Sequence, residues 1–147
     1  MKGEKVLYSA ASQEWGTPFD LYKSLNDEFH FTLDPCTTPD NPLGTPKFYT
    51  KAEDGLEQSW YGERVFCNPP YGKDISMWLG GSMGPHGGAP SVAVYLLPAR
   101  TDTKWFHDYC WPMDEAMCEI RFIKGRLKFR GAKWPAPFPS MIVIFRG

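Results

Sequence analysis

The sequence predicts an α/β fold with a mostly parallel sheet wound on both sides by helices, and three observations lead to this class. Strand-like and helix-like segments alternate along the chain, which favours parallel strands joined by crossovers. Residues 91–97 form a continuous apolar run, as expected for a strand buried on both faces. Polar residues follow three predicted strands directly, and sheets of this class bind ligands at the carboxyl ends of their strands.

Composition sets the broad class of the protein. The 147 residues are 42% hydrophobic and carry 16 Lys and Arg against 17 Asp and Glu. This predicts one domain over residues 1–147, with 1–13 as a loosely ordered arm, and excludes a disordered chain. No apolar run approaches the ~20 residues of a membrane helix, and the first residues lack a signal-peptide core. We therefore expect a soluble, cytoplasmic protein that binds no membrane.

The cysteines and histidines argue against a metal site. The chain has four cysteines and three histidines with no C-x-x-C pair, whereas structural zinc needs clustered soft ligands. We therefore expect no metal, and reduced, buried thiols at all four cysteines, which are Cys36, Cys67, Cys110 and Cys118.

In chain order, the first element is a helix over 19–29, with Thr17 as its predicted N-cap, Pro18 at the first helical position and Asp20 in the first turn. Its apolar residues recur at helical spacing. Alternating apolar residues then predict a strand over 29–34 that ends at Asp34, and a short strand follows at 47–50.

The second half begins with a strand at 65–67 that stops at Asn68. The Gly- and Pro-rich stretch 80–90 predicts a flexible loop. It is followed by the strand at 91–97 and a helix at 102–110. A hairpin of 119–123 with 127–129 around Lys124-Gly125-Arg126 comes next, and a last strand lies at 141–145.

The motif Asn68-Pro69-Pro70-Tyr71 indicates a specific chemistry. The amino group of adenine is a poor nucleophile because its lone pair is delocalised into the ring. The side-chain oxygen of Asn68 and the carbonyl of Pro69 could accept hydrogen bonds from the two N–H groups of this amine and so localise the lone pair on the nitrogen. The two prolines hold these acceptors in place, and Tyr71 could stack on a base that has left the duplex. This chemistry requires no covalent nucleophile and no metal.

The motif resembles the catalytic motif of S-adenosylmethionine-dependent amino-group methyltransferases, and the chain from about residue 14 to 146 resembles the small phage-type DNA N6-adenine methyltransferase family. The matching segments, in order, are 14–18, 31–36, 53–56 with Trp60, the Asn68 motif, 97–106 and 123–129. The resemblance implies a Rossmann-like methyltransferase fold in minimal form, with a mostly parallel sheet and a C-terminal antiparallel hairpin. It also implies a phage or prophage origin, and hence the cytoplasm of a bacterial host.

The resemblance implies S-adenosylmethionine as the cofactor and assigns nine residues to it. Trp15, Thr17 and Pro18 correspond to the segment that holds its methionine end, where a helix start suits a carboxylate. The strand-end group Asp34, Pro35 and Cys36 includes the acidic anchor for the methionine ammonium, Asp34. The element that contacts the cofactor adenine corresponds to Asp54, Gly55 and Leu56.

The expected partner is double-stranded DNA with one base flipped out. A basic stretch, 121–133, carries six Lys and Arg and no acid; it is either a phosphate-contacting face or the charged edge of a hairpin. The candidate DNA contacts are Lys73, Arg100, Thr101, Lys104, Trp105 and Arg126. With no separate recognition domain expected, the 80–90 loop and the 124–133 turn are candidates for site specificity.

Two departures from the usual pattern and three alternatives remain. Pro35-Cys36 stands where methyltransferases of this fold carry a glycine-rich loop, and the acid for the cofactor ribose is ambiguous between Asp40 and Glu53. Cys36 after a proline would also suit covalent cytosine-C5 chemistry, in which the Asn68 motif has no role. The same amine chemistry could act on RNA adenine or a protein glutamine amide. A non-catalytic nucleic-acid-binding phage protein is the remaining alternative.

Overall fold

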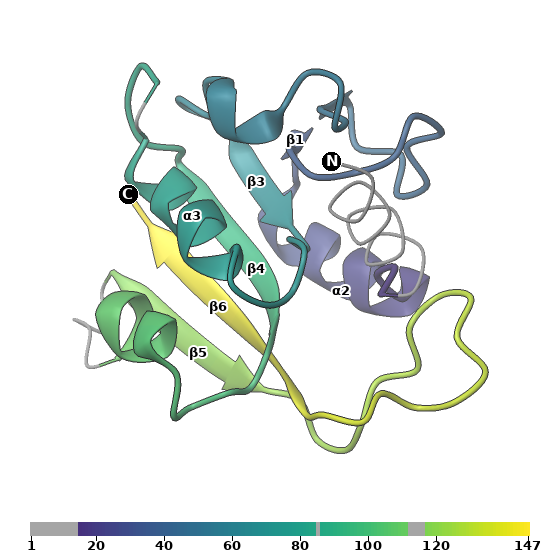
Figure 1. The fold of residues 1–147 in the computed structure, drawn as a ribbon. Helices are drawn as coiled ribbons and strands as arrows, with labels where there is room; N and C mark the ends of the chain where they lie inside the picture. The colour runs from purple at the N-terminus through teal and green to yellow at the C-terminus, as the bar shows by residue number, and fades with distance from the viewer. Residues whose placement is uncertain (1–14, 85, 112–116) are drawn as a thin grey trace.

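The centre of the molecule is a single sheet, seen in a computed structural model that describes residues 15–84, 86–111 and 117–147 (Figure 1). Within these residues the sheet has six strands in the order β2-β1-β3-β4-β6-β5. Their bounds are β1 Leu33–Asp34, β2 Lys47–Phe48, β3 Arg64–Cys67, β4 Val92–Pro98, β5 Cys118–Phe122 and β6 Ser140–Arg146. Strands β2, β1, β3 and β4 are parallel, whereas β6 is antiparallel to both β4 and β5. This confirms the predicted mostly parallel sheet with a C-terminal antiparallel pair. The predicted arm at 1–13 lies outside the described residues.

Both faces of the sheet are covered, with α2 (Phe19–Phe29) on one side and α3 (Ile75–Gly80) on the other (Figure 1). All seven residues of β4 are buried, and its side chains alternate between the two cores. Val94 and Leu96 pack on the α2 side, while Tyr95 and Leu97 pack on the α3 side. This burial confirms the interpretation of 91–97 as a central strand.

The first helix and strand differ in detail from the prediction. Pro18 occupies the N-cap position in extended conformation, and no side chain caps the helix there, so the predicted cap by Thr17 is wrong. Phe29 completes the buried helical face with Tyr22 and Leu25. The helix then ends at His30 in left-handed conformation, which leaves β1 with two residues.

Helix α3 was not predicted, and it continues into a 3₁₀ turn, η2 (Gly81–Met83). The start of the predicted flexible loop is therefore helical. Packing explains the glycine at this place, because a Cβ on Gly81 would lie 2.5 Å from the ring of Trp60. The glycine suggested a turn in the sequence, whereas in the fold it allows the helical backbone at Gly81 to pack closely against the ring of Trp60. The helix predicted at 102–110 is confirmed over residues 104–110, where η3 (Phe106–Cys110) is a π-helix.

The predicted hairpin partner of β5 is wrong. Strand β5 pairs with β6, with Ile120 opposite Val143, and the described residues 127–129 contain no strand. The segment 123–139 is instead a long excursion that projects beyond the sheet (Figure 1). Phe129 is buried in the α2-side core, and the backbone N–H of Arg130 donates to the carbonyl of Gly16 at 2.8 Å. Core packing and this bridge to the N-terminal segment replace the local hairpin.

All four cysteines are buried, as expected. Burial raises the pKa of the Cys110 thiol to about 12 and that of Cys118 to about 11. In the part of the chain that the structure describes, no three His, Cys, Asp or Glu side chains gather in a way that would hold a metal ion. The same described residues contain no helix of the length and apolar character needed to cross a membrane.

Candidate active site

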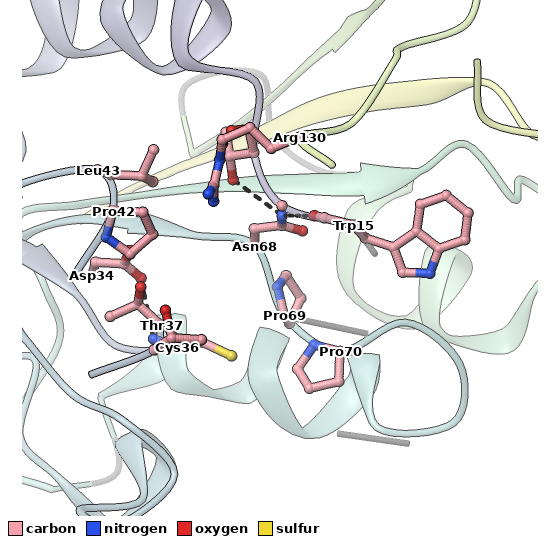
Figure 2. A pocket seen from close by; sticks show the side chains of 13 residues that line it. Trp15, Asp34, Cys36, Thr37, Pro42, Leu43, Asn68, Pro69, Pro70 and Arg130 are labelled. Atoms are coloured by element: carbon pink, nitrogen blue, oxygen red, sulfur yellow. Dashed lines mark hydrogen bonds between the residues drawn. The ribbon is translucent and has the colours of Figure 1, made fainter. Parts of the chain in front are cut away.

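A cavity with about 440 Å³ of empty space, part of it open to solvent, lies where β1 and β3 end (Figure 2). Strand β1 places Asp34 in its wall, and β3 leads directly into Asn68. The lining residues are Trp15, Gly16, Thr17, Asp34, Cys36, Thr37, Thr38, Pro42, Leu43, Asn68, Pro69, Pro70 and Arg130. Two of the three polar strand ends identified in the sequence therefore meet in one cavity, while the third, after β4, lies outside its lining.

The amide of Asn68 has a defined orientation. Its Nδ2 donates to the carbonyl of Trp15 at 2.6 Å and to Oγ1 of Thr17 at 3.0 Å. A carbonyl only accepts, so the nitrogen must face Trp15. The buried Oδ1 is left without a hydrogen-bond donor among the described residues. Such orphaned acceptors are uncommon and call for an explanation. Asn68, which lines the cavity, thus carries an acceptor with no partner among the described residues.

Tyr71 packs in an aromatic cluster beside the cavity. Its ring is nearly parallel to that of Trp15, with centroids 6.4 Å apart, and it makes edge contacts with Phe129 and Phe138. Its hydroxyl donates to the carbonyl of Leu96 at 3.3 Å. Burial raises the pKa of the Tyr71 phenol far above its usual value, so the ring stays neutral. Stacking of Tyr71 on a substrate base remains a prediction.

Asp34 is a buried carboxyl group, only 3% exposed. Its Oδ1 accepts from the backbone N–H of Cys36 at 3.2 Å. Burial raises its pKa from 3.8 to about 7, whereas the bonds from Cys36 and Thr37 and the charge of Arg130 oppose this rise. A carboxylate in this position is stabilised by a bound cation. Asp34 therefore fits the role of an ammonium anchor that the resemblance implies.

Arg130 is the main lining residue that the sequence analysis did not assign to a site. Its Nε donates to the carbonyl of Thr17 at 2.9 Å, across 113 residues of sequence. In the sequence Arg130 was one of several cations in the basic stretch, and no local pattern sets it apart. The other lining residues without a predicted role are Gly16, Thr37, Thr38, Pro42 and Leu43.

The segment predicted to contact the cofactor adenine lies next to the cavity, outside its lining. A Cβ on Gly55 would stand 1.9 Å from the carbonyl oxygen of Pro35, so these two backbones are in direct contact. Asp54 is exposed and accepts from the N–H of Leu56 at 3.2 Å. The two segments that the resemblance assigns to the cofactor, 34–36 and 54–56, are therefore neighbours in space. Pro18 also lies outside the lining.

Neither ribose candidate lines the cavity. Glu53 accepts at Oε1 from the backbone N–H and the hydroxyl of Thr50, at 2.7 and 2.8 Å. Asp40 accepts from the hydroxyl of Thr38. Both carboxylates therefore have local partners, and the assignment of the ribose acid stays open.

The predicted nucleic-acid contacts lie on the surface rather than in the cavity. The guanidinium of Arg100 lies 5.6 Å from the ring centre of Phe138, a neighbour of Tyr71. Lys104 pairs with Asp108 at 2.5 Å. Lys73, Arg100, Thr101, Lys104 and Arg126 are exposed, and Trp105 is half-buried. Of these six, Arg100 is tied to the aromatic cluster of the site by an observed contact.

Comparisons with known proteins identify the fold and the family of the chain. The fold is similar to that of the 23S rRNA methyltransferase ErmE, with a TM-score of 0.50 and 15% identity over 99% of this chain and 68% of that chain. At this identity the likeness bears on the fold alone. Comparison with curated protein sequences finds no match. A family model described as DNA N-6-adenine-methyltransferase (Dam) matches residues 5–146, and since this span covers nearly the whole sequence, the chain belongs to that family of adenine methyltransferases.

Proposed function

We propose that the protein, a single methyltransferase domain over residues 1–147 working in the cytoplasm, transfers a methyl group from S-adenosylmethionine to the N6 amino group of adenine in DNA. The observation that carries this proposal is the buried Oδ1 of Asn68, which has no partner among the described residues and stands in the cavity wall that also holds Asp34. An amino group entering the cavity would supply the missing donor.

The residues present fit the cofactor. The buried carboxyl of Asp34 suits the methionine ammonium, and the segment of Trp15, Thr17 and Pro18 leads into the start of α2, where backbone N–H groups favour an anion. We assign the contact with the cofactor adenine to Asp54 and Leu56, and the packing of Gly55 against the 34–36 segment supports this assignment. When bound, the cofactor supplies an activated methyl group on a sulfonium.

The chain itself prepares the amino group for attack. Asn68 Oδ1 and the carbonyl of Pro69 accept hydrogen bonds from the two N6–H groups. These bonds localise the nitrogen lone pair and direct it towards the methyl donor. Trp15 and Thr17 hold the Asn68 amide in the accepting orientation. The two prolines keep this acceptor pair rigid. As the N–C bond forms, the bond from the methyl carbon to the sulfonium sulfur would break and leave a neutral thioether. The nitrogen then loses one of its two protons to water.

The 123–139 segment supports a nucleic-acid substrate. It carries exposed cations at Lys124, Arg126, Lys128 and Lys133, while Phe129 and Arg130 tie its middle to the site. Phosphates bound on these cations would lie beside the cavity that receives the flipped adenine. The family description favours DNA over RNA.

The test is incubation of the purified protein with unmethylated DNA and methyl-labelled S-adenosylmethionine, followed by mass spectrometry of the nucleosides. The proposal expects N6-methyldeoxyadenosine, formed about 10²- to 10³-fold more slowly by an Asn68→Ala variant that still binds the cofactor. Parallel reactions with RNA and with a glutamine-containing protein substrate distinguish the alternatives. Methyl transfer to RNA or to protein with none to DNA would overturn the DNA assignment, and binding of no cofactor would overturn the enzyme assignment.

A further inference from the structure

The charged side chain of Arg130 lines the cavity and is held by one side-chain hydrogen bond. Its Nε is used by the carbonyl of Thr17, and its guanidinium carbon lies 4.9 Å from the ring centre of Phe19. Within the described residues no acceptor is recorded for the two terminal Nη groups, and no carboxylate lies within ion-pair distance. Figure 2 shows the end of this side chain directed into the cavity. Two strong donors are therefore available to a ligand.

Asp34 provides the opposite charge in the same cavity. It lies close enough for Arg130 to lower its pKa, yet the two side chains form no salt bridge. Thr37, Pro42 and Leu43 line the space around them. A cavity with an unpaired cation on one side and a buried carboxyl on the other matches a ligand with an anionic and a cationic group a few ångströms apart.

We propose that Arg130 binds the α-carboxylate at the methionine end of S-adenosylmethionine, while Asp34 binds the α-ammonium of the same end. This inference rests on the proposed function, since it names a residue for the cofactor assigned there. A guanidinium is suited to the task because its planar donors match the two oxygens of a carboxylate. The bond from Arg130 to Thr17 also links this end of the cofactor to the segment that orients Asn68.

Gly16 is the residue that leaves room for the guanidinium. A Cβ at this position would lie 2.9 Å from Nη2 of Arg130 and 3.1 Å from Cζ. The two closest contacts are with the far end of a flexible side chain, and the third, with Cβ of Arg130 at 3.2 Å, is tight but needs only a small shift, so alanine should displace the guanidinium and leave the chain folded. Gly16→Ala therefore moves the charge without removing it.

The test measures binding by calorimetry in the absence of DNA, with two probes. S-adenosylhomocysteine carries the amino-acid end, whereas 5′-methylthioadenosine lacks it. Arg130→Met should weaken S-adenosylhomocysteine binding about 10- to 100-fold, which is the range expected when one charge-assisted hydrogen-bonded pair between protein and ligand is lost. It should leave methylthioadenosine binding unchanged. Lys47→Met, on an exposed ion pair with Glu63, is the matched control and should alter neither.

Gly16→Ala completes a cycle that keeps the inference testable even if Arg130→Met folds poorly. Alone it should weaken S-adenosylhomocysteine binding, and in the Arg130→Met background it should add little. If Gly16→Ala weakens S-adenosylhomocysteine binding equally in the wild type and in Arg130→Met, the added methyl group acts on the ligand directly and not through Arg130. That result would overturn the inference. Equal losses for both probes in Arg130→Met, or no loss for either, would also overturn it. If the wild-type protein binds neither probe, the proposed function itself fails.

Discussion

Asn68→Ala is the substitution that most directly tests the site. It removes two hydrogen bonds, to the carbonyl of Trp15 and to the hydroxyl of Thr17, at a cost of roughly 0.5–1.5 kcal/mol each. It also removes the partnerless Oδ1, whose burial costs about 1–3 kcal/mol. The two effects oppose each other, so the free energy of unfolding should change by less than about 2 kcal/mol. The variant should stay folded.

The effect on catalysis should be much larger than the effect on folding. Removing one preorganised hydrogen-bonding group from a transition state typically costs 10²–10³ in kcat, or about 3–4 kcal/mol. In the proposed mechanism the amide contacts the substrate amine and not the cofactor, so S-adenosylmethionine affinity should stay within a few-fold of wild type. The assay is methyl transfer to DNA under saturating cofactor, with calorimetry for cofactor binding and thermal unfolding for stability.

Ser140→Ala is a matched control, because Ser140 Oγ is also buried without a partner among the described residues and lies outside the cavity lining. This variant should gain a little stability and keep full activity. A loss of cofactor binding in Asn68→Ala that matches its loss of activity would refute the acceptor role. The acceptor role would also be refuted if Asn68→Ala kept more than about a tenth of wild-type kcat, because the expected loss is 10²–10³.

Three further predictions follow from the same contacts. Gly55→Ala should destabilise the fold by about 1–3 kcal/mol, because its Cβ would meet a backbone oxygen at 1.9 Å, whereas Gly80→Ala, with 4.0 Å of clearance, should not; chemical unfolding compares them. The pKa of Asp34 is raised from 3.8 to about 7, so wild-type stability without cofactor should fall as pH rises from about 4 to about 7, by up to roughly 4 kcal/mol in all and by roughly 3 kcal/mol above pH 5. Asp34→Asn should abolish that fall in thermal unfolding scans at pH 5 and 8, and an equally steep fall in the variant would contradict the assignment. Arg126→Met should weaken DNA binding and reduce the slope of log affinity against log salt concentration by about 1, as measured by fluorescence anisotropy. If its slope equals that of Lys47→Met, the basic stretch is better explained as the charged edge of the sheet.

The sequence by itself determined the class of the sheet and the edge at which the candidate site lies. The continuous run of β4 requires burial on both faces, and buried strands joined by crossovers leave a parallel sheet as the arrangement that satisfies them. Strand ends in such a sheet share one edge, so Asp34 and Asn68 were expected together, and both line the cavity. These are local signals, because each depends on residue types within one element and on a rule of the fold class.

Tertiary structure decided what no local pattern encodes. Thr17 looked like a helix cap, yet its hydroxyl accepts from Asn68, 51 residues away. Residues 127–129 looked like a hairpin strand, yet β5 pairs with β6 and frees this segment to pack Phe129 beside Tyr71. Arg130 enters the cavity through the same excursion, by a bond across 113 residues. Each of these contacts joins segments distant in sequence, so its energy exists only once the sheet has brought them together.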